Sequence, residues 1–162
     1  TPAAATGAPA TVSPRPGPTP VGALERATVV RVVDGDTIRV DRGRGSEALR
    51  YIGIDAPETV RPGHPVEWMG PEAAAANASL VEGREVLLER DVSDTDRFGR
   101  LLRYVWVELE SSGLAMVNLE LVARGYAAAV TYPPDVRWTD ALRAAQAAAR
   151  DAGLGLWGDP PP

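Results

Sequence analysis

Two short acidic motifs carry the side chains best suited to chemistry. They are DGDTIRV at residues 34–40 and IDAPE at residues 54–58. Crowded carboxylates repel one another, so a positive charge should lie between them or the side chains should point apart. A simpler interpretation is that Asp34 and Asp36 only cap a tight turn.

Asp36 and Asp55 are the pair that the predicted strands would bring together. Asp36 stands at the start of a second strand and Asp55 follows a third. In an antiparallel meander these two points lie at the same edge of the sheet. Because no histidine or cysteine accompanies them, they predict an oxygen-ligand site that favours Ca²⁺ or Mg²⁺ over zinc or copper.

Glu58, Arg50 and Arg100 complete a set that would suit a phosphodiester. Glu58 lies three residues beyond Asp55, where a carboxylate could take a proton from water. Arginines bind phosphate oxygens with two parallel hydrogen bonds and stabilise charge that grows in a transition state. Each residue alone has a plain alternative: an exposed loop glutamate, or a solvated surface arginine.

The spacing of Arg50 and Asp55 is a difficulty for this interpretation. Residues five apart on a regular strand point to opposite faces, so a bulge near Gly53 must redirect one of them. Two aromatic residues, Phe98 and Tyr132, would serve to stack on bases or simply to pack.

The elements expected to position these groups are five strands and three helices. The strand patterns are two runs within residues 27–40 joined at Asp34-Gly35, then residues 48–54, 84–90 and 100–109. The helical patterns are residues 70–83 with Pro71 at the first position, 118–125 with Asn118 as cap, and 139–153 with Thr139 as cap. This content predicts an α+β fold, a five-stranded β-barrel of the OB type with three helices.

Composition separates a linker from a folded part. Residues 1–24 are rich in Pro, Ala and Thr and are expected to be a disordered linker. Residues 25–158 are expected to form the folded domain, and residues 159–162 a frayed tail. Such a linker is typical of chains that follow a secretion signal or an anchor, so a secreted or surface-tethered monomer is expected, although no apolar run is long enough to span a membrane.

Net charge argues against a strong nucleic-acid binder. The formal charge is −5, whereas phosphate contacts need cations. All 17 basic residues are arginine, which fits either codon bias or a use of guanidinium groups on phosphate. The absence of cysteine excludes disulfides and thiolate chemistry.

Taken together, the motifs resemble the staphylococcal nuclease (thermonuclease) family. The resemblance rests on DGDTIRV, Arg50, IDAPE and TDRFGR (residues 95–100), with further likeness in ETVRPGHPVEWMGPEA (residues 58–73), MVNLELVARGYA and GLW, and it covers residues 26–158. It implies an OB-fold nuclease that hydrolyses DNA and RNA with little sequence specificity. Ca²⁺ is the implied cofactor, with Mg²⁺ or Mn²⁺ as alternatives, and the implied products end in 3′-phosphate.

The resemblance also assigns roles to residues. It implies metal binding by Asp36, Asp55 and the backbone carbonyl of Ala56, and catalysis by Arg50, Glu58 and Arg100. It implies nucleotide contacts from Arg97, Phe98 and Tyr132. Tyr51 and Arg103 depart from the family pattern, where an aliphatic and a small residue are expected. The alternative function is a non-catalytic nucleic-acid-binding module of the same fold.

Overall fold

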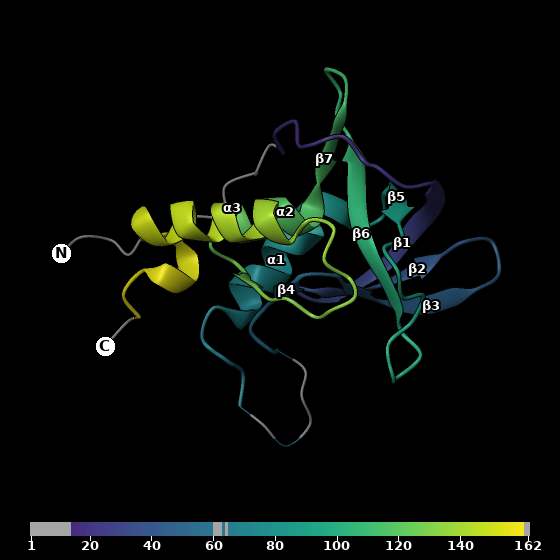
Figure 1. Ribbon diagram of the computed structural model, residues 1–162. Helices are drawn as coiled ribbons and strands as arrows, with labels where there is room; N and C mark the ends of the chain where they lie inside the picture. Colours follow the sequence, from purple (N-terminus) through teal and green to yellow (C-terminus); the bar gives the residue numbers. More distant parts are fainter. Residues whose placement is uncertain (1–13, 60–62, 64, 161–162) are drawn as a thin grey trace.

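The computed structural model describes residues 14–59, 63 and 65–160 and contains a closed β-barrel with helices gathered beside it (Figure 1). The residues of the expected linker and tail that lie outside this range are 1–13 and 161–162. The five barrel strands are β1 (Leu24–Asp34), β2 (Thr37–Asp41), β3 (Ser46–Tyr51), β5 (Glu85–Glu89) and β6 (Leu101–Glu108).

The barrel closes through one parallel pairing. The strands follow the order β3-β2-β1-β5-β6, and β3 then pairs with β6 in parallel, with Leu49 opposite Leu101. Closure leaves these strands no free edge within the barrel, which is how small barrels avoid pairing with other chains. The predicted OB-type α+β fold is confirmed. A short strand, β7 (Leu114–Met116), continues the sheet from β6.

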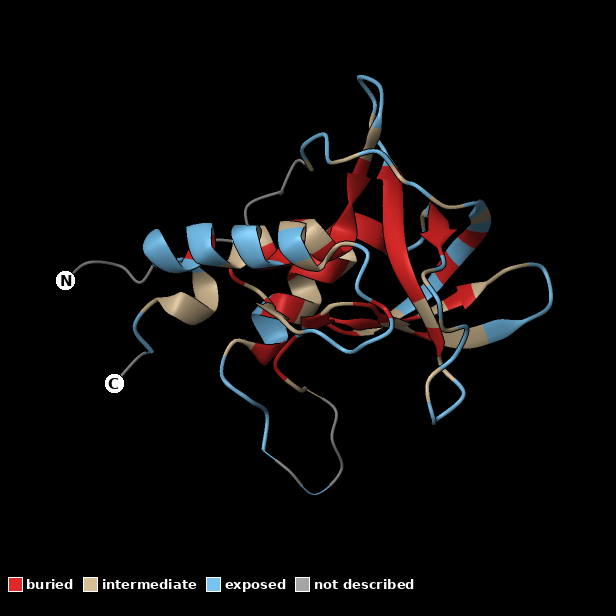
Figure 2. Cartoon of the chain, in the orientation of Figure 1, coloured by how far each residue is buried: buried red, intermediate tan, exposed pale blue. Residues whose placement is uncertain are grey.

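Alternation along the strands fills the barrel and leaves arginines outside. Ile38 and Val40 on β2 and Leu49 on β3 are fully buried, while the residues between them face outward. Successive strand residues point to opposite faces, so Arg39 and Arg50 lie on the outer surface of the barrel. Strand β6 is buried along most of its length, as its red ribbon shows (Figure 2).

Three helices pack against one side of the barrel, as expected. They are α1 (Gly70–Val81), α2 (Val117–Ala123) and α3 (Thr139–Asp151). Pro71 stands in the first turn of α1, where its missing N–H is not needed. In α3, Leu142 and Ala149 are buried while the opposite face is exposed.

Two predicted helix caps are wrong. Met116 and Trp138 occupy the N-cap positions of α2 and α3, and neither helix has a side-chain cap. Asn118 is instead buried: its Nδ2 donates to the carbonyl of Ile52 at 2.8 Å, and its Oδ1 accepts from the N–H of Val105 at 2.9 Å. The Asn118 amide thus joins the segment after β3 to β6, and local sequence spacing does not reveal partners this far apart in the chain.

Short segments join the helices and the N-terminal stretch to the barrel. Strand β4 (Ile54–Asp55) pairs with β8 (Ala128–Ala129), and a 3₁₀ turn, η1 (Gly155–Trp157), follows α3. The described residues 14–23 are extended and hydrogen bonded to the domain. The N–H groups of Val21 and Gly22 donate to the buried carboxylate of Glu89 at 2.7 and 3.0 Å.

Candidate active site

A tight turn between β1 and β2 holds the first acidic motif. Asp34 ends β1 and Thr37 begins β2, so Gly35 and Asp36 form the turn of the predicted hairpin. The N–H of Asp36 donates to Asp34 Oδ1 at 3.1 Å. Gly35 cannot carry a side chain, because an added Cβ would lie 2.7 Å from the Cβ of Ala56 and 2.8 Å from that of Ala73. The turn is therefore pressed against the second acidic motif.

The buried carboxylate of Asp36 links the two motifs. Its Oδ2 accepts a 2.7 Å hydrogen bond from the N–H of Ala56, and its Oδ1 accepts one from the hydroxyl of Thr37 at 2.9 Å. Asp55 precedes Ala56, so this bond fixes the position of the second motif against the first. The predicted meeting of the two strand ends is present in the structure.

Arg50 lies between the two carboxylates. Its Nη2 is 3.3 Å from Asp36 Oδ2 and 3.4 Å from Asp55 Oδ1. Its Nη1 donates to the carbonyls of Tyr51 and Ile54 at 2.9 and 2.8 Å. The guanidinium is thus the positive charge among the acids, and it is fixed by four contacts.

A glycine turn solves the spacing difficulty of Arg50 and Asp55. Strand β3 ends at Tyr51, and Gly53 adopts a φ of 80° before β4 begins at Ile54. Such a positive φ is readily available only to glycine. The chain reverses its side-chain direction there, so Arg50 and Asp55 point to the same place despite their odd separation.

Burial and crowding of the carboxylates raise the pKa values of two of these acids. Burial raises the pKa of Asp34 well above its usual range, and the negative charge of Asp36 raises it further. Burial also raises the pKa of Asp55, with Asp36 adding to the effect and Arg50 opposing it. We call Asp34, Asp36 and Asp55 the acidic edge. Its field favours a cation, because a positive charge relieves both repulsion and desolvation.

Glu58 lies close enough to the acidic edge for its charge to raise the pKa of Asp34. The backbone of Glu58 is tied to Glu67 in both directions: the N–H of Glu58 donates to Glu67 Oε2, and the N–H of Glu67 donates to the carbonyl of Glu58, each at 3.0 Å. The half-buried side chain of Glu58 forms no hydrogen bond among the described residues.

A buried pair behind the turn braces the acidic edge. The hydroxyl of Tyr51 donates to Asn77 Oδ1 at 2.7 Å, and Asn77 Nδ2 donates to the carbonyl of Asp34 at 2.9 Å. Tyr51 and Asn77 are both almost fully buried. Sequence reasoning missed Asn77, whose only signal was a polar residue on the face of α1 that is otherwise alanine and leucine.

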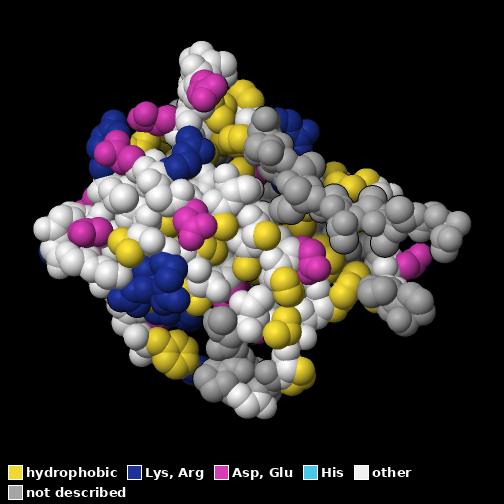
Figure 3. Space-filling view, turned by 180° about the vertical axis from the view of Figure 1, so that it is seen from behind, with side chains coloured by type: hydrophobic (Ala, Val, Ile, Leu, Met, Phe, Trp, Pro, Cys, Tyr) yellow, Lys and Arg dark blue, Asp and Glu magenta, His cyan; other side chains and the backbone are white. Residues whose placement is uncertain are grey.

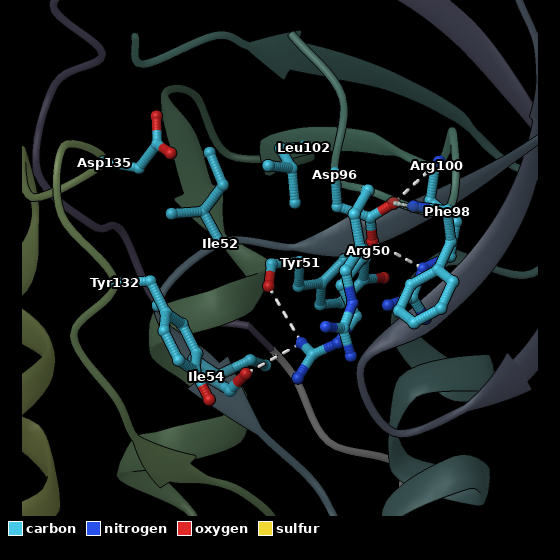
Figure 4. Close-up of a pocket in the computed structure, with 12 residues that line it drawn as sticks. Arg50, Tyr51, Ile52, Ile54, Asp96, Phe98, Arg100, Leu102, Tyr132 and Asp135 are labelled. Carbon is cyan, nitrogen blue, oxygen red and sulfur yellow. Dashed lines mark hydrogen bonds and ion pairs between the residues drawn. The ribbon is translucent and has the colours of Figure 1, made fainter. Parts of the chain in front are cut away.

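A pocket of about 570 Å³ opens beside Arg50. Phe98 and Arg100 stand on one side of it and Tyr132 on the other, with Ile52 and Leu102 at its back (Figure 4). The Phe98 and Tyr132 side chains are 68% and 66% exposed, which is unusual for aromatic rings. Five predicted site residues line this pocket: Arg50, Arg97, Phe98, Arg100 and Tyr132. Asp36, Asp55, Ala56 and Glu58 are not among the residues that line it.

The loop that carries three of these residues is held by its own hydrogen bonds. We call residues 94–100 the arginine loop. Asp96 Oδ1 accepts from the N–H groups of Phe98 and Arg100 at 2.9 and 3.0 Å, and its Oδ2 accepts from Arg100 Nε at 2.7 Å. Arg97 and Arg100 lie over the Phe98 ring at 4.7 and 5.4 Å from its centroid. Arginines gather in a patch at the lower left of Figure 3, beside a hydrophobic side chain.

Arg103 anchors this loop to the barrel. It is almost fully buried, and its Nη1 and Nη2 donate to the carbonyl and Oδ1 of Asp94 at 2.8 and 2.7 Å. The residue therefore replaces a small side chain of the family pattern with a charged one that has its own partner. Asp96 and Asp94 were not predicted as parts of the site, because their role is to hold arginines rather than to touch a ligand.

The donor atoms of the acidic edge are all hard oxygens, which suits Ca²⁺ or Mg²⁺. Within the ranges that the structure describes, no group of three or more His, Cys, Asp or Glu side chains is arranged to hold a metal ion. Two carboxylates and one carbonyl fit such a cation only if water completes its shell, as is common for Mg²⁺ and Ca²⁺. The residues therefore fit a partly hydrated cation rather than one enclosed by protein.

The structure is an OB-fold domain in which acidic and arginine side chains lie close to a pocket, and its family can be named from a comparison with known proteins. The family model described as "Staphylococcal nuclease homologue" matches residues 48–159. The chain therefore belongs to the staphylococcal nuclease family, and the predicted resemblance is confirmed.

Curated relatives agree with this assignment. "Thermonuclease" of Staphylococcus hyicus is 39% identical over 129 residues, covering 80% of this chain and 73% of the relative. "Thermonuclease" of Staphylococcus intermedius is 38% identical over 133 residues, covering 82% and 76%. "Endonuclease YncB" of Bacillus subtilis (strain 168) is 35% identical over 136 residues, covering 83% and 62%. None of the helices in the described part of the chain is long and apolar enough to cross a membrane.

Proposed function

We propose that this protein is a nuclease that hydrolyses phosphodiester bonds of DNA or RNA with little sequence specificity and depends on Ca²⁺. The observation that carries the proposal is Arg50, held between Asp36 and Asp55 and exposed on its other side to the pocket. Relatives named thermonuclease and endonuclease support the reaction class. Mg²⁺ and Mn²⁺ are the alternative cations.

The residues divide the chemistry between them. Asp36, Asp55 and the carbonyl of Ala56 would hold the cation, which when bound supplies Lewis-acid polarisation of the phosphate. Arg50 and Arg100 bind the non-bridging oxygens of the phosphodiester and stabilise the charge that grows on them. Arg97, Phe98 and Tyr132 hold the neighbouring nucleotide by charge and stacking.

Glu58 is the proposed general base. It takes a proton from water as the water oxygen attacks phosphorus, and the bond from phosphorus to the 5′-oxygen breaks. The leaving 5′-oxygen takes a proton from solvent water, so the products are a 3′-phosphate and a 5′-hydroxyl. A base placed in this way contributes about 10²–10⁴-fold to the rate.

The architecture supports this division of roles. Asp36 cannot act as a free base, because both its oxygens accept hydrogen bonds within the fold. Glu58 is the nearby carboxylate whose side chain forms no hydrogen bond among the described residues. We also propose that the protein acts as a monomer and that it works outside the cell or at its surface. The composition of residues 1–24 supports the second of these proposals.

Digestion of single-stranded DNA tests the function directly. The wild-type protein, incubated with Ca²⁺, is expected to give fragments ending in 3′-phosphate, to lose activity in chelator, and to recover it when Ca²⁺ returns. Glu58→Gln should retain substrate binding but lose about 10²-fold or more in kcat. Full activity in chelator would reject the metal role, and an unchanged kcat would reject the base. Binding in a gel shift without cleavage under any cation would favour the non-catalytic module.

A further inference from the structure

Two arginines stand directly opposite each other on the outer face of the barrel. Arg31 on β1 pairs in register with Arg39 on β2. Arg31 is exposed, and Arg39 is half-buried. Opposed residues of an antiparallel pair have Cα atoms about 5 Å apart, so the Arg31 and Arg39 side chains leave the sheet from adjacent positions on the same face.

The same face continues to Arg50. Arg39 pairs with Ala48 on β3, and Arg50 lies two residues further along that strand, opposite Thr37. Two residues along a strand span about 7 Å, so Arg39 and Arg50 are diagonal neighbours on the outer surface. We call Arg31, Arg39 and Arg50 the arginine row. It begins at the pocket, which Arg50 lines, and leads away across three strands.

The outer part of this row has no ion-pair partner among the described residues. Neither Arg31 nor Arg39 pairs with a carboxylate there, whereas Arg26 on β1 and Arg42 just after β2 pair with glutamates. Arg39 is steadied by Ser46, to which its Nε and Nη2 donate at 2.7 and 3.0 Å. The acid on this face, Asp41, uses its Oδ1 to accept three N–H groups of the hairpin, from residues 43, 44 and 45.

Like charges that face each other across two strands destabilise a sheet. The arrangement of Arg31 and Arg39 is therefore unfavourable for folding unless an anion lies on it. In a protein with a net charge of −5, such a row also provides local attraction for phosphate that the whole molecule does not.

We propose that the arginine row is a binding track for the sugar–phosphate backbone of a single nucleic-acid strand, which leaves the pocket at Arg50 and continues over Arg39 and Arg31. This inference rests on the proposed function. Charge complementarity and continuity with the pocket identify the occupant. The exposed Phe98 and Tyr132 rings favour unpaired bases at the pocket, so the strand is single where it enters the row.

The track predicts how binding depends on salt. Each phosphate contact to a single strand contributes about 0.7 to the slope of log K against log salt concentration. Arg31→Ala and Arg39→Ala should each lower this slope by about 0.7, and the double variant by about 1.4. Each lost contact should weaken binding by about 3-fold at low salt. Arg143→Ala on the exposed face of α3 removes the same charge elsewhere and should leave the slope unchanged.

Fluorescence anisotropy with a labelled thymidine strand about 20 nucleotides long, titrated in chelator at several salt concentrations, measures these slopes. A wild-type slope and affinity in the double variant would overturn the track, as would an equal effect of Arg143→Ala. The double variant should melt close to wild type, because the removed repulsion offsets the loss of the two exposed hydrogen bonds from Arg39 to Ser46.

A hydrolysis assay separates this inference from the proposed function. With Ca²⁺, the double variant should cleave a dinucleotide at the wild-type rate but show a raised KM for the long strand. If the wild-type protein cleaves neither substrate under any cation, the proposed function fails, while the salt slopes still decide the track. If it cleaves both and the double variant has an unchanged KM for the long strand, the track fails and the function stands.

Discussion

Arg50 contacts the acidic edge and lines the pocket beside the arginine loop, but these two regions hold their side chains in different ways. At the acidic edge, Asp36 bonds to Ala56, which is 20 residues away in sequence, and Asn77 bonds to Asp34 from a helix. In the arginine loop, Asp96 bonds to residues two and four positions further on. One region is fixed by tertiary contacts, and the other mainly by its own turn.

This difference matches two demands of phosphodiester chemistry. Groups that stabilise a transition state must be preorganised, because any movement they make during the reaction lowers the rate. Groups that hold varied bases without sequence preference must adapt to each one. We expect changes at the acidic edge to reduce kcat, changes at Arg97 and Phe98 to raise KM, and changes that release Arg100 to do both.

The largest expected effect is at Arg50, which forms ion pairs with Asp36 and Asp55 of the acidic edge and lines the pocket. Arg50→Lys keeps the charge but cannot donate in parallel to Tyr51, Ile54 and a phosphate at once. The expected loss is about 10²–10³-fold in kcat, comparable with removal of one preorganised donor. Steady-state kinetics on a short DNA strand measures it, with Arg143→Lys as the control for any arginine-to-lysine change. A kcat within a few fold of wild type would show that the bidentate geometry is not needed.

A change at Asn77 tests whether the brace behind the edge matters for catalysis. Asn77→Ala leaves the Tyr51 hydroxyl and the Asp34 carbonyl buried without partners. The expected cost is about 2–4 kcal/mol of unfolding free energy, together with a fall in kcat. Tyr51→Phe should cost less, about 1–2 kcal/mol, because it removes only one of the two bonds. Urea unfolding measures both. A normal kcat in a folded Asn77→Ala protein would show that the Tyr51–Asn77 pair contributes to stability but not to catalysis.

A change at Asp96 tests the arginine loop in the opposite sense. Asp96→Ala frees the N–H groups of Phe98 and Arg100 and releases the Arg100 side chain. We expect KM to rise about 10-fold, which corresponds to the loss of one charge-assisted hydrogen bond, and kcat to change less. Steady-state kinetics resolves the two parameters. If kcat falls more than KM rises, the loop is as much part of the preorganised machinery as the acidic edge.

The smallest expected effect is that of the Arg103–Asp94 pair, which anchors the arginine loop, on the pH dependence of the free energy of unfolding. The hydrogen bond from Arg103 lowers the pKa of Asp94 below its ordinary value of 3.8. The stability from this pair is therefore fully present above pH 3.8 and is lost as pH falls through the lower folded-state pKa. Because Asp94 is half-exposed, solvent screens the pair, and its contribution stays below about 1 kcal/mol.

Comparison of Asp94→Asn with wild type by urea unfolding from pH 7 to acid tests this assignment. The variant should be slightly less stable near neutral pH, and the two proteins should converge in strong acid. A difference that persists at the lowest pH would mean that the Asp94 carboxylate does not supply the stability.

The same contrast explains how much the sequence could predict. Local signals located the hairpin at Asp34-Gly35, the start of α1 at Pro71 and the barrel strands, because turn chemistry and alternation act over a few residues. Convergence of Asp36 and Asp55 also followed from strand order. The turn at Gly53 was identified only as a requirement, since spacing alone placed Arg50 on the wrong face.

Residues with distant partners were beyond such reasoning. Asn118 has the sequence position of a helix cap but bonds to Ile52 and Val105. Asn77 and Tyr51 gave no sequence signal of the brace, because both lie in stretches whose pattern is explained by packing. The register that pairs Arg31 with Arg39 depends on irregularities in β1, between Val29 and Arg31 and between Val32 and Asp34. Bulges of this kind are set by the closed barrel rather than by local composition.

The proposed cation site at Asp36 and Asp55 is best tested by the initial rate of cleavage of a short single DNA strand as Ca²⁺ is titrated, for wild type and for Asp36→Asn. Asn keeps the size of the side chain and one oxygen but removes the charge that faces Arg50 and Asp55. We expect a saturable Ca²⁺ dependence for wild type and a much lower rate for the variant, with half-saturation shifted to higher Ca²⁺. Identical titration curves for the two proteins would contradict it.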